Sequence, residues 1–217
     1  MELFGARVLV VGATGTLGGL AAYALEERGA HVALAGRNPV RLAALARELR
    51  DCPARSFEAY DLDQCSALAP WAERSLDGLD GVLVAVGAAG FGAVQDVSNA
   101  AAGHLLTVNA LCPMAVLRGA APVVADKGFL LAVTGSAADP PGEGTADYTA
   151  SKAALSRWLE ALAEELVPRS VAVLDIRSPR LDTGFTERPV TGSPPPLPPG
   201  ADALEAVRSL VDRIASA

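Results

Sequence analysis

The chain contains few cysteines, few histidines and no excess of positive charge. Its 217 residues include three cysteines, two histidines, and 18 Lys and Arg residues against 25 Asp and Glu residues. The cysteines cannot all pair within one chain and show no CxxC spacing, so neither a disulfide framework nor a zinc site is indicated. His31 and His104 have no ligand partner at useful spacing, and no metal is expected. The net charge of −7 argues against nucleic acid or anionic lipid as partners and leaves small molecules as the default ligands.

Signals for export and for membrane insertion are also lacking. The first seven residues, Met-Glu-Leu-Phe-Gly-Ala-Arg, have no basic start followed by an apolar stretch, so no signal peptide is expected. The longest uncharged run, residues 97–117, includes Asn99, His104, Asn109 and Pro113 and is only mildly apolar. We expect it to form a buried or subunit-facing helix, in a protein of the reducing cytoplasm that meets no membrane.

Short apolar segments alternate with helical patterns along the whole chain. The predicted strands are residues 7–11, 31–35, 55–60, 81–86, 128–133 and 171–176. Between the first two, apolar residues recur at the spacing of one helix face, from Leu17 to Leu25. Strands that are continuously apolar need cover on both faces, and each crossover returns to start a parallel neighbour. The sequence therefore predicts an α/β fold with a doubly wound parallel sheet.

Helix boundaries and the chain length indicate a single domain over residues 1–217. Gly29 is expected to end the first helix, and Asn38-Pro39 to begin the second. Only 41 residues follow the sixth strand, including a last amphipathic helix with apolar positions at Leu204, Val207, Val211 and Ile214. The Pro-rich stretch within residues 184–200 is interpreted either as a stiff surface loop or as a lid on the substrate side.

A glycine cluster lies between the first strand and the first helix. It reads Gly12-Ala-Thr-Gly15-Thr-Leu-Gly18. Glycines at such a place let the backbone turn tightly and admit a pyrophosphate to the bare N–H groups of a helix N-terminus. The pattern predicts dinucleotide binding; the alternative is a tight strand-to-helix turn without a ligand.

The residues after the second and third strands bear on which dinucleotide would bind. NAD sites use an acidic residue about 20 positions beyond the glycines, but this sequence has Ala35-Gly36-Arg37 there. Arg37 can make charge-assisted hydrogen bonds to a 2′-phosphate, so NADP is favoured over NAD unless Arg37 is a solvated surface charge. Asp61-Leu62 is interpreted either as a contact for the adenine ring or as the start of a helix.

Tyr148 and Lys152 lie four residues apart at the start of a long predicted helix. They share one helix face, so we expect the ammonium group to favour the phenolate and lower the pKa of Tyr148. Such a phenol can donate and recover a proton near neutral pH. The fifth strand ends in Val133-Thr-Gly-Ser136 and brings a hydroxyl to the edge of the sheet where the glycine cluster lies.

In these features the chain resembles the short-chain dehydrogenases/reductases along nearly its whole length. The residues that carry the resemblance are the glycine cluster, Arg37, Asp61, Asn109, Ser136, the Tyr148-x-x-x-Lys152 pair, Ser178-Pro179 and Thr183. The resemblance implies a Rossmann fold, a nicotinamide cofactor and hydride transfer, in which the protein supplies positioning and electrostatics. By the same likeness the protein is expected to be a homodimer or homotetramer.

The resemblance also implies roles for individual residues. Tyr148 would donate a proton to a carbonyl oxygen, Ser136 would hydrogen-bond that oxygen, and Lys152 would hold the nicotinamide ribose. Asn109 would support a water-linked proton relay to Lys152, and Thr183 would approach the carboxamide. The expected cofactor-binding residues are Gly12, Thr14, Gly15, Thr16, Leu17, Gly18, Arg37, Asp61, Leu62, Gly87, Pro179 and Thr183.

Three departures from the family pattern define the alternatives. Residues 85–88 read Ala-Val-Gly-Ala where Asn-Asn-Ala-Gly is usual, Arg180 replaces a glycine, and no seventh strand follows the final helix. Arg180 would face cofactor or substrate, or serve as a surface charge. We expect an NADP-dependent oxidoreductase that interconverts a carbonyl and an alcohol on a small, largely uncharged substrate. The alternatives are a catalytically idle NADP-binding redox sensor or scaffold, and an isomerase or epimerase, which the lack of a substrate domain disfavours.

Overall fold

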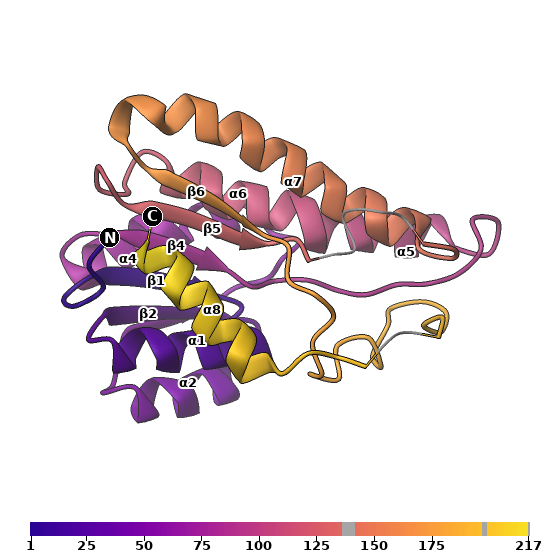
Figure 1. The fold of residues 1–217 in the computed structure, drawn as a ribbon, viewed down its shortest axis with the longest axis horizontal. Helices are drawn as coiled ribbons and strands as arrows, with labels where there is room; N and C mark the ends of the chain where they lie inside the picture. The colour runs from indigo at the N-terminus through magenta and orange to yellow at the C-terminus, as the bar shows by residue number, and fades with distance from the viewer. Residues whose placement is uncertain (136–141, 197–198, 217) are drawn as a thin grey trace.

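A computed structural model describes residues 1–135, 142–196 and 199–216. Its core is one parallel sheet of six strands in the order β3-β2-β1-β4-β5-β6 (Figure 1). The strands are β1 (Arg7–Val11), β2 (His31–Gly36), β3 (Ala54–Ser56), β4 (Gly81–Val84), β5 (Phe129–Val133) and β6 (Ala172–Ile176). The doubly wound parallel sheet predicted from the sequence is confirmed.

Helices cover both faces of the sheet. They are α1 (Thr16–Glu27), α2 (Pro39–Glu48), α3 (Leu62–Ser66), α4 (Leu68–Leu76), α5 (Asn99–Leu106), the π-helical turn η1 (Thr107–Leu111), α6 (Cys112–Ala120), α7 (Ala146–Leu166), the 3₁₀ turn η3 (Val167–Arg169) and α8 (Ala203–Ala215). Buried side chains of α1, α2 and α8 share one apolar core with one face of the sheet. Those of α3, α4, α6 and α7 share the other core with the opposite face.

Local sequence signals account for several helix boundaries. The side chain of Asn38 caps α2 by accepting hydrogen bonds from the amides of Val40 and Arg41, and Pro39 occupies the first turn. Gly29 follows α1 with a φ of +83°, a conformation that residues with side chains rarely adopt. Both boundaries agree with the sequence predictions.

Two details of the sequence prediction are wrong. The third strand ends at Ser56 rather than Tyr60. Phe57 is buried in the core, and the chain leaves the sheet there to reach Asp61, which caps α3. In α8, Val207, Val211 and Ile214 are buried as expected, but Leu204 is 44% exposed. Leu204 lies in the first turn of α8 and is not among the buried residues of the helix.

The uncharged run of residues 97–117 forms most of a continuous helical segment, α5–η1–α6. By length and composition this segment, Asn99–Ala120, is one helix that would be long enough to cross a membrane. It packs against α3, α4 and α7, and the buried side chains of α6 belong to the core between sheet and helices. These contacts identify it as a core helix of the fold, the first of the two possibilities given for this run.

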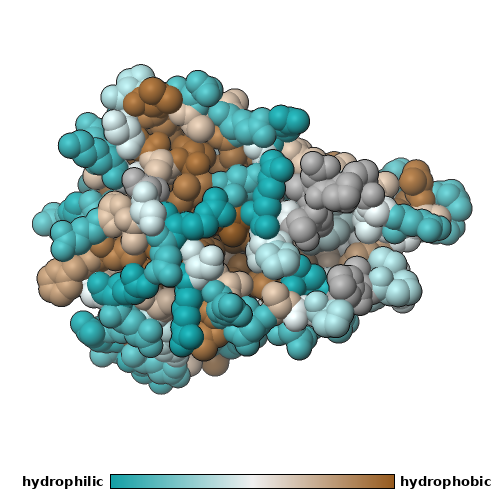
Figure 2. Space-filling model, in the orientation of Figure 1, coloured by the Kyte–Doolittle hydropathy of each residue, from teal (hydrophilic) through white to brown (hydrophobic). Residues whose placement is uncertain are grey.

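The β6 edge of the sheet and the carboxyl ends of its strands differ in what covers them. On the α8 side, β6 is the edge strand and most of its residues are only half-buried. Figure 2 shows hydrophobic atoms there, between α7 and α8, on a face that is otherwise largely hydrophilic. The carboxyl ends of the strands are covered by the loops after β1, β4 and β6 and by the start of α7 (Figure 1).

Candidate active site

The glycine turn after β1 is shaped by the backbone of its neighbours. Gly12 has a φ of +88°, and a Cβ atom built on it would lie 2.5 Å from the carbonyl oxygen of Ala85, which follows β4. A Cβ on Gly18 would lie 2.3 Å from the carbonyl oxygen of Gly12. These distances are too short for any side chain, so the glycines hold α1 against the turn and the turn against the loop after β4. The turn lies at the carboxyl end of β1 beside β4, where the strand order reverses and where open α/β sheets bind their ligands.

The start of α1 suits an anionic group. Gly15 is the N-cap and has no side chain to accept from the first-turn amides, and the first turn of this fully described helix has no acidic residue. Free amides and the positive end of the helix dipole favour a phosphate at this place. The turn therefore fits the pyrophosphate of a dinucleotide. The assignment of Thr14, Thr16 and Leu17 to cofactor binding stays a prediction.

The residues predicted to read the adenosine end lie at the same edge. A Cβ on Gly36 would lie 2.9 Å from Cγ2 of Thr14, so the end of β2 and its exposed neighbour Arg37 adjoin the glycine turn. The carboxylate of Asp61 accepts a hydrogen bond from the amide of Gln64 at 2.9 Å, so it begins α3, one of its two predicted roles.

Tyr148 lies near the N-terminus of α7 and is half-buried beneath Phe91. The two rings meet edge to face, with their centroids 6.1 Å apart. Burial raises the pKa of Tyr148 to about 12. The expectation of a lowered pKa is therefore wrong, because burial of the phenol raises it.

Lys152 is the most deeply buried cation of the site. It is 5% exposed, and its Nζ donates a hydrogen bond to the carbonyl oxygen of Val133, at the end of β5, over 3.2 Å. Burial lowers its pKa to about 8, and the negative charge of Asp175 opposes that decrease. A group with this pKa is mostly an ammonium ion at neutral pH but loses its proton under mildly alkaline conditions.

Asn109 ties the loop after β4 to α7. The residue lies in the π-helical turn η1 and is fully buried. Its Oδ1 accepts from the amide of Ala88 at 2.8 Å, and its Nδ2 donates to the carbonyl oxygen of Ala88 at 2.9 Å and to Oγ of Ser151 at 3.0 Å. Ser151 in turn donates to the carbonyl oxygen of Tyr148 at 2.7 Å. Residues 85–88, Ala-Val-Gly-Ala, therefore form a loop that the side chain of Asn109 holds in place.

Gly87 is the point at which these groups converge. A Cβ atom on Gly87 would lie 3.1 Å from Nζ of Lys152, 3.2 Å from Oδ1 of Asn109 and 3.7 Å from Cζ of Phe185. A ligand that approaches Lys152 and Asn109 therefore passes over a residue without a side chain. The structure brings together Gly87, Asn109 and Lys152, with Tyr148 one turn before Lys152 on α7; Ser136 lies outside the described residues.

The segment after β6 covers this point. Two backbone hydrogen bonds join it to the loop after β4: the amide of Val190 donates to Ala89 at 2.8 Å, and the amide of Phe91 donates to Thr191 at 3.0 Å. Arg180 is ion-paired with Glu187 at 2.7 Å, within the same segment. Pro179 and Thr183 stand at the start of this segment, and their cofactor contacts stay predictions.

Sequence reasoning missed the polar groups that support Lys152 and Asn109. Ser151 was visible only as part of the Tyr-Thr-Ala-Ser-Lys run, with nothing to show that it meets Asn109. Thr134, Ser156 and Asp175 form a second buried cluster beyond Lys152, built from three elements. No group of three or more metal-ligating side chains occurs in the portion of the chain that the structure describes.

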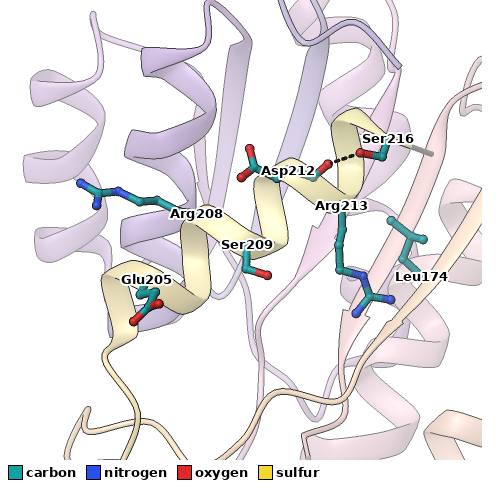
Figure 3. A pocket seen from close by; sticks show the side chains of 7 residues that line it. All are labelled: Leu174, Glu205, Arg208, Ser209, Asp212, Arg213 and Ser216. Atoms are coloured by element: carbon teal, nitrogen blue, oxygen red, sulfur yellow. Dashed lines mark hydrogen bonds between the residues drawn. The ribbon is translucent and has the colours of Figure 1, made fainter.

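Two surface hollows lie outside the Gly87 region. One is lined by residues 58 and 60–64 and includes Asp61 and Leu62, the predicted adenine contacts. The other lies between α8 and β6 (Figure 3), and contains none of the predicted site residues; its lining is Leu174, Glu205, Arg208, Ser209, Asp212, Arg213 and Ser216.

Comparisons with known proteins agree with this architecture. The family model for short chain dehydrogenases matches residues 6–191. The 3-oxoacyl-[acyl-carrier-protein] reductase FabG of Rickettsia bellii is 27% identical over 197 residues, which cover 87% of this chain and 78% of that protein.

Two solved structures are also similar. A short-chain oxidoreductase of Thermus thermophilus is 31% identical and superposes with a TM-score of 0.82, covering 96% of this chain and 95% of that one. A short chain dehydrogenase of Burkholderia cenocepacia, in complex with NADP, is 23% identical with a TM-score of 0.83, covering 99% of this chain and 92% of that one. The match of the family model to most of the chain, together with the glycine turn and the parallel sheet, shows that this protein belongs to the short-chain dehydrogenase family.

Proposed function

We propose that this oxidoreductase reduces a carbonyl group on a small, largely uncharged molecule with NADPH as hydride donor. The observation that carries the proposal is that Lys152 and Asn109 meet at Gly87, in the loop that packs on the glycine turn, while Tyr148 lies one turn before Lys152 on α7. The family supports the oxidoreductase class, and the name of the Rickettsia relative supports a carbonyl substrate. NADPH would bind along Gly12, Gly15 and Gly18 and supply the hydride.

The protonation states of the site favour reduction. With a pKa of about 12, Tyr148 stays a phenol at neutral pH and can donate its proton to the carbonyl oxygen as the carbon accepts the hydride. Lys152, mostly protonated at pH 7, is positioned to bind a ribose hydroxyl and to return a proton to Tyr148. Ser136 would orient the carbonyl oxygen. The product is an alcohol, and the balance is one hydride and one proton.

The choice of NADPH rests on charge at the end of β2. Arg37 is exposed beside the glycine turn, and the end of β2 has no carboxylate that would bind a free 2′-hydroxyl. The Burkholderia structure holds NADP in the same fold, which supports the proposal without deciding it.

Tyr148→Phe tests the catalytic assignment. NADPH oxidation with a panel of aldehydes and ketones is expected to fall by at least about 100-fold, because the phenyl ring keeps the packing under Phe91 but cannot donate a proton. NADPH affinity, measured by fluorescence titration, is expected to change by less than about threefold, since ~0.6 kcal/mol is the effect of a minor contact. Tyr23→Phe on α1 is the matched control, because it removes a hydroxyl that bonds to Glu48 of α2 and no predicted site residue. Turnover by Tyr148→Phe at the wild-type rate would exclude the proposed role.

The panel also separates this function from the alternative of a catalytically idle NADP-binding protein. If the wild-type protein binds NADPH but turns over no carbonyl or alcohol in a broad panel, the sensor or scaffold function is favoured instead.

A further inference from the structure

Asp175, near the end of β6, has a half-buried carboxylate that the proposed mechanism does not use. Its Oδ1 accepts a short hydrogen bond from Oγ1 of Thr134. Its Oδ2 accepts from Oγ of Ser156 at 2.6 Å and from Nε of Arg177 at 3.1 Å. The side chain is 19% exposed. Three donors from three different segments fix the orientation of this carboxylate, whereas a surface acid can be hydrated by water alone.

The partners of Asp175 are also the neighbours of Lys152. Ser156 follows Lys152 by one turn of α7, so the two side chains leave the helix on the same face. Thr134 directly follows Val133, whose carbonyl oxygen accepts the hydrogen bond from Nζ of Lys152. The carboxylate and the ammonium group are thus held between the same two elements, the end of β5 and the middle of α7.

Asp175 acts on Lys152 through its charge. Within the described residues, it is the charged group that raises the pKa of Lys152 against the effect of burial. Tyr148 on α7 is the other ionisable group near the amine. The segment α5–η1–α6, which also packs against α7, contributes the uncharged amide of Asn109. Arg177 bonds both to Asp175 and to Oγ of Ser156, and so closes the network on its solvent side.

We propose that Asp175 is a positioning residue for the proposed reaction: Thr134 and Ser156 hold its negative charge behind Lys152, and this charge keeps Lys152 an ammonium ion in its buried setting. The inference rests on the proposed function, because Lys152 is useful to a nucleotide ribose and to Tyr148 only while it is charged. Without Asp175, burial alone would favour the neutral amine at a lower pH. Activity and cofactor binding would then fall at a correspondingly lower pH.

The composition of the chain makes a direct test feasible. Lys127 and Lys152 are its two lysines. Protein grown on [ε-¹³C]lysine therefore gives two side-chain signals, and exposed Lys127 serves as the reference within each sample. Their chemical shifts, followed from pH 6 to pH 11 without cofactor, report the pKa of each amine independently of any turnover.

Asp175→Asn removes the charge with little change of shape. The pKa of Lys152 is expected to fall by about 0.5–1 unit, as for the loss of an opposite charge several ångströms away, while that of Lys127 stays constant. Ser156→Ala is the matched control: it removes one donor to the same carboxylate but leaves its charge, so the decrease is expected to be less than half as large. An unchanged pKa of Lys152 in a folded Asp175→Asn protein would overturn the proposal.

A second variant tests the idea if Asp175→Asn does not fold. Arg177→Gln removes the countercharge of Asp175 at the solvent side, and the pKa of Lys152 is expected to rise. A decrease or no change would overturn the proposal.

An activity measurement separates this inference from the proposed function. In an active enzyme, the alkaline limb of kcat/KM for Asp175→Asn is expected to shift to lower pH by the same amount as the pKa of Lys152. A limb that does not move would overturn the positioning role even if the pKa of Lys152 moves. If the wild-type protein has no turnover at all, the proposed function fails, and the NMR titration still decides whether Asp175 controls the charge of Lys152.

Discussion

The glycine turn and the polar cluster around Lys152 lie at the same edge of the sheet but are built in opposite ways. At the turn, the backbone of Gly12, Gly18 and Ala85 approaches so closely that there is no room for a side chain. At the cluster, buried Asn109 donates a hydrogen bond to Ser151, and buried Lys152 donates to the carbonyl oxygen of Val133. We therefore expect added atoms to disrupt the glycine turn, the proposed cofactor side. We expect loss of polar atoms to disrupt the polar cluster, the proposed catalytic side.

The largest effect is expected from Gly18→Ala. The new methyl group would overlap the carbonyl oxygen of Gly12 at 2.3 Å and push α1 away from the turn. We expect about 1–3 kcal/mol of lost stability. NADPH affinity should fall about 100-fold, equivalent to ~3 kcal/mol, in calorimetric titration. Gly103→Ala is the control, because a Cβ there meets no atom within 4 Å and alanine is the better helix former. Similar NADPH affinity in both variants would contradict the steric account of the turn.

The catalytic side is probed by Asn109→Ala. Its removal leaves the half-buried amide and carbonyl groups of Ala88 without the Asn109 side chain and takes one donor from Ser151, and urea unfolding is expected to show a loss of about 2–3 kcal/mol. Turnover should fall as well, because the loop after β4 is no longer tied to α7. Asn99→Ala, at the exposed first residue of α5, should stay within about 0.5 kcal/mol of wild type. Equal stability of the two variants would show that the Asn109 bonds do not organise the site.

Arg37→Asp tests whether one side chain near the glycine turn contributes to NADPH binding. Loss of charge-assisted bonds to a 2′-phosphate is expected to weaken NADPH binding by about 10–100-fold, corresponding to ~1.5–3 kcal/mol. NADH binding should change much less. Arg41→Asp, on the exposed face of α2, controls for the change in net charge. If Arg37→Asp weakens NADPH and NADH equally, the role in binding the phosphate is rejected.

The smallest effect is expected where the two halves of the sheet are joined. Asp80, before β4, binds the guanidinium of Arg7 on β1 through both carboxylate oxygens and also accepts from the Arg7 amide. These bonds lower the pKa of Asp80. Because the folded-state pKa lies below the unfolded value, the stabilisation is present above about pH 4 and is lost as the pH falls through the folded-state pKa.

Asp80→Asn is therefore expected to lower the free energy of unfolding by about 1–2 kcal/mol at pH 7, with the difference shrinking below pH 4. The control is Asp126→Asn, which breaks an ion pair whose carboxylate is 72% exposed and should cost at most about 0.5 kcal/mol. A pH-independent difference for Asp80→Asn would show that charge is not the cause.

The same contrast explains what could be read from the sequence. Local patterns predicted three helices: the glycine turn predicted the start of α1, Asn38 the start of α2, and the region of Tyr148 and Lys152 the start of α7. The partners of Asp175 and Asn109 lie 41 and 42 residues away at Thr134 and Ser151, so no local pattern reveals them. The pKa of Tyr148 was predicted in the wrong direction because helix spacing shows a neighbouring charge but not the burial under Phe91.

The loop of residues 182–200 enters and leaves the fold at one place. Leu181 and Ala201 form a parallel bridge, with the amide of Asp182 donating to Ala201 at 3.1 Å and the amide of Ala201 donating to Arg180 at 2.8 Å. Loop closure depends only weakly on length once such a base exists. A segment of different length or sequence could therefore replace the one between Leu181 and Ala201 without moving the strands, and such exchanges would change the groups that cover Gly87 while leaving Asn109 and Lys152 in place.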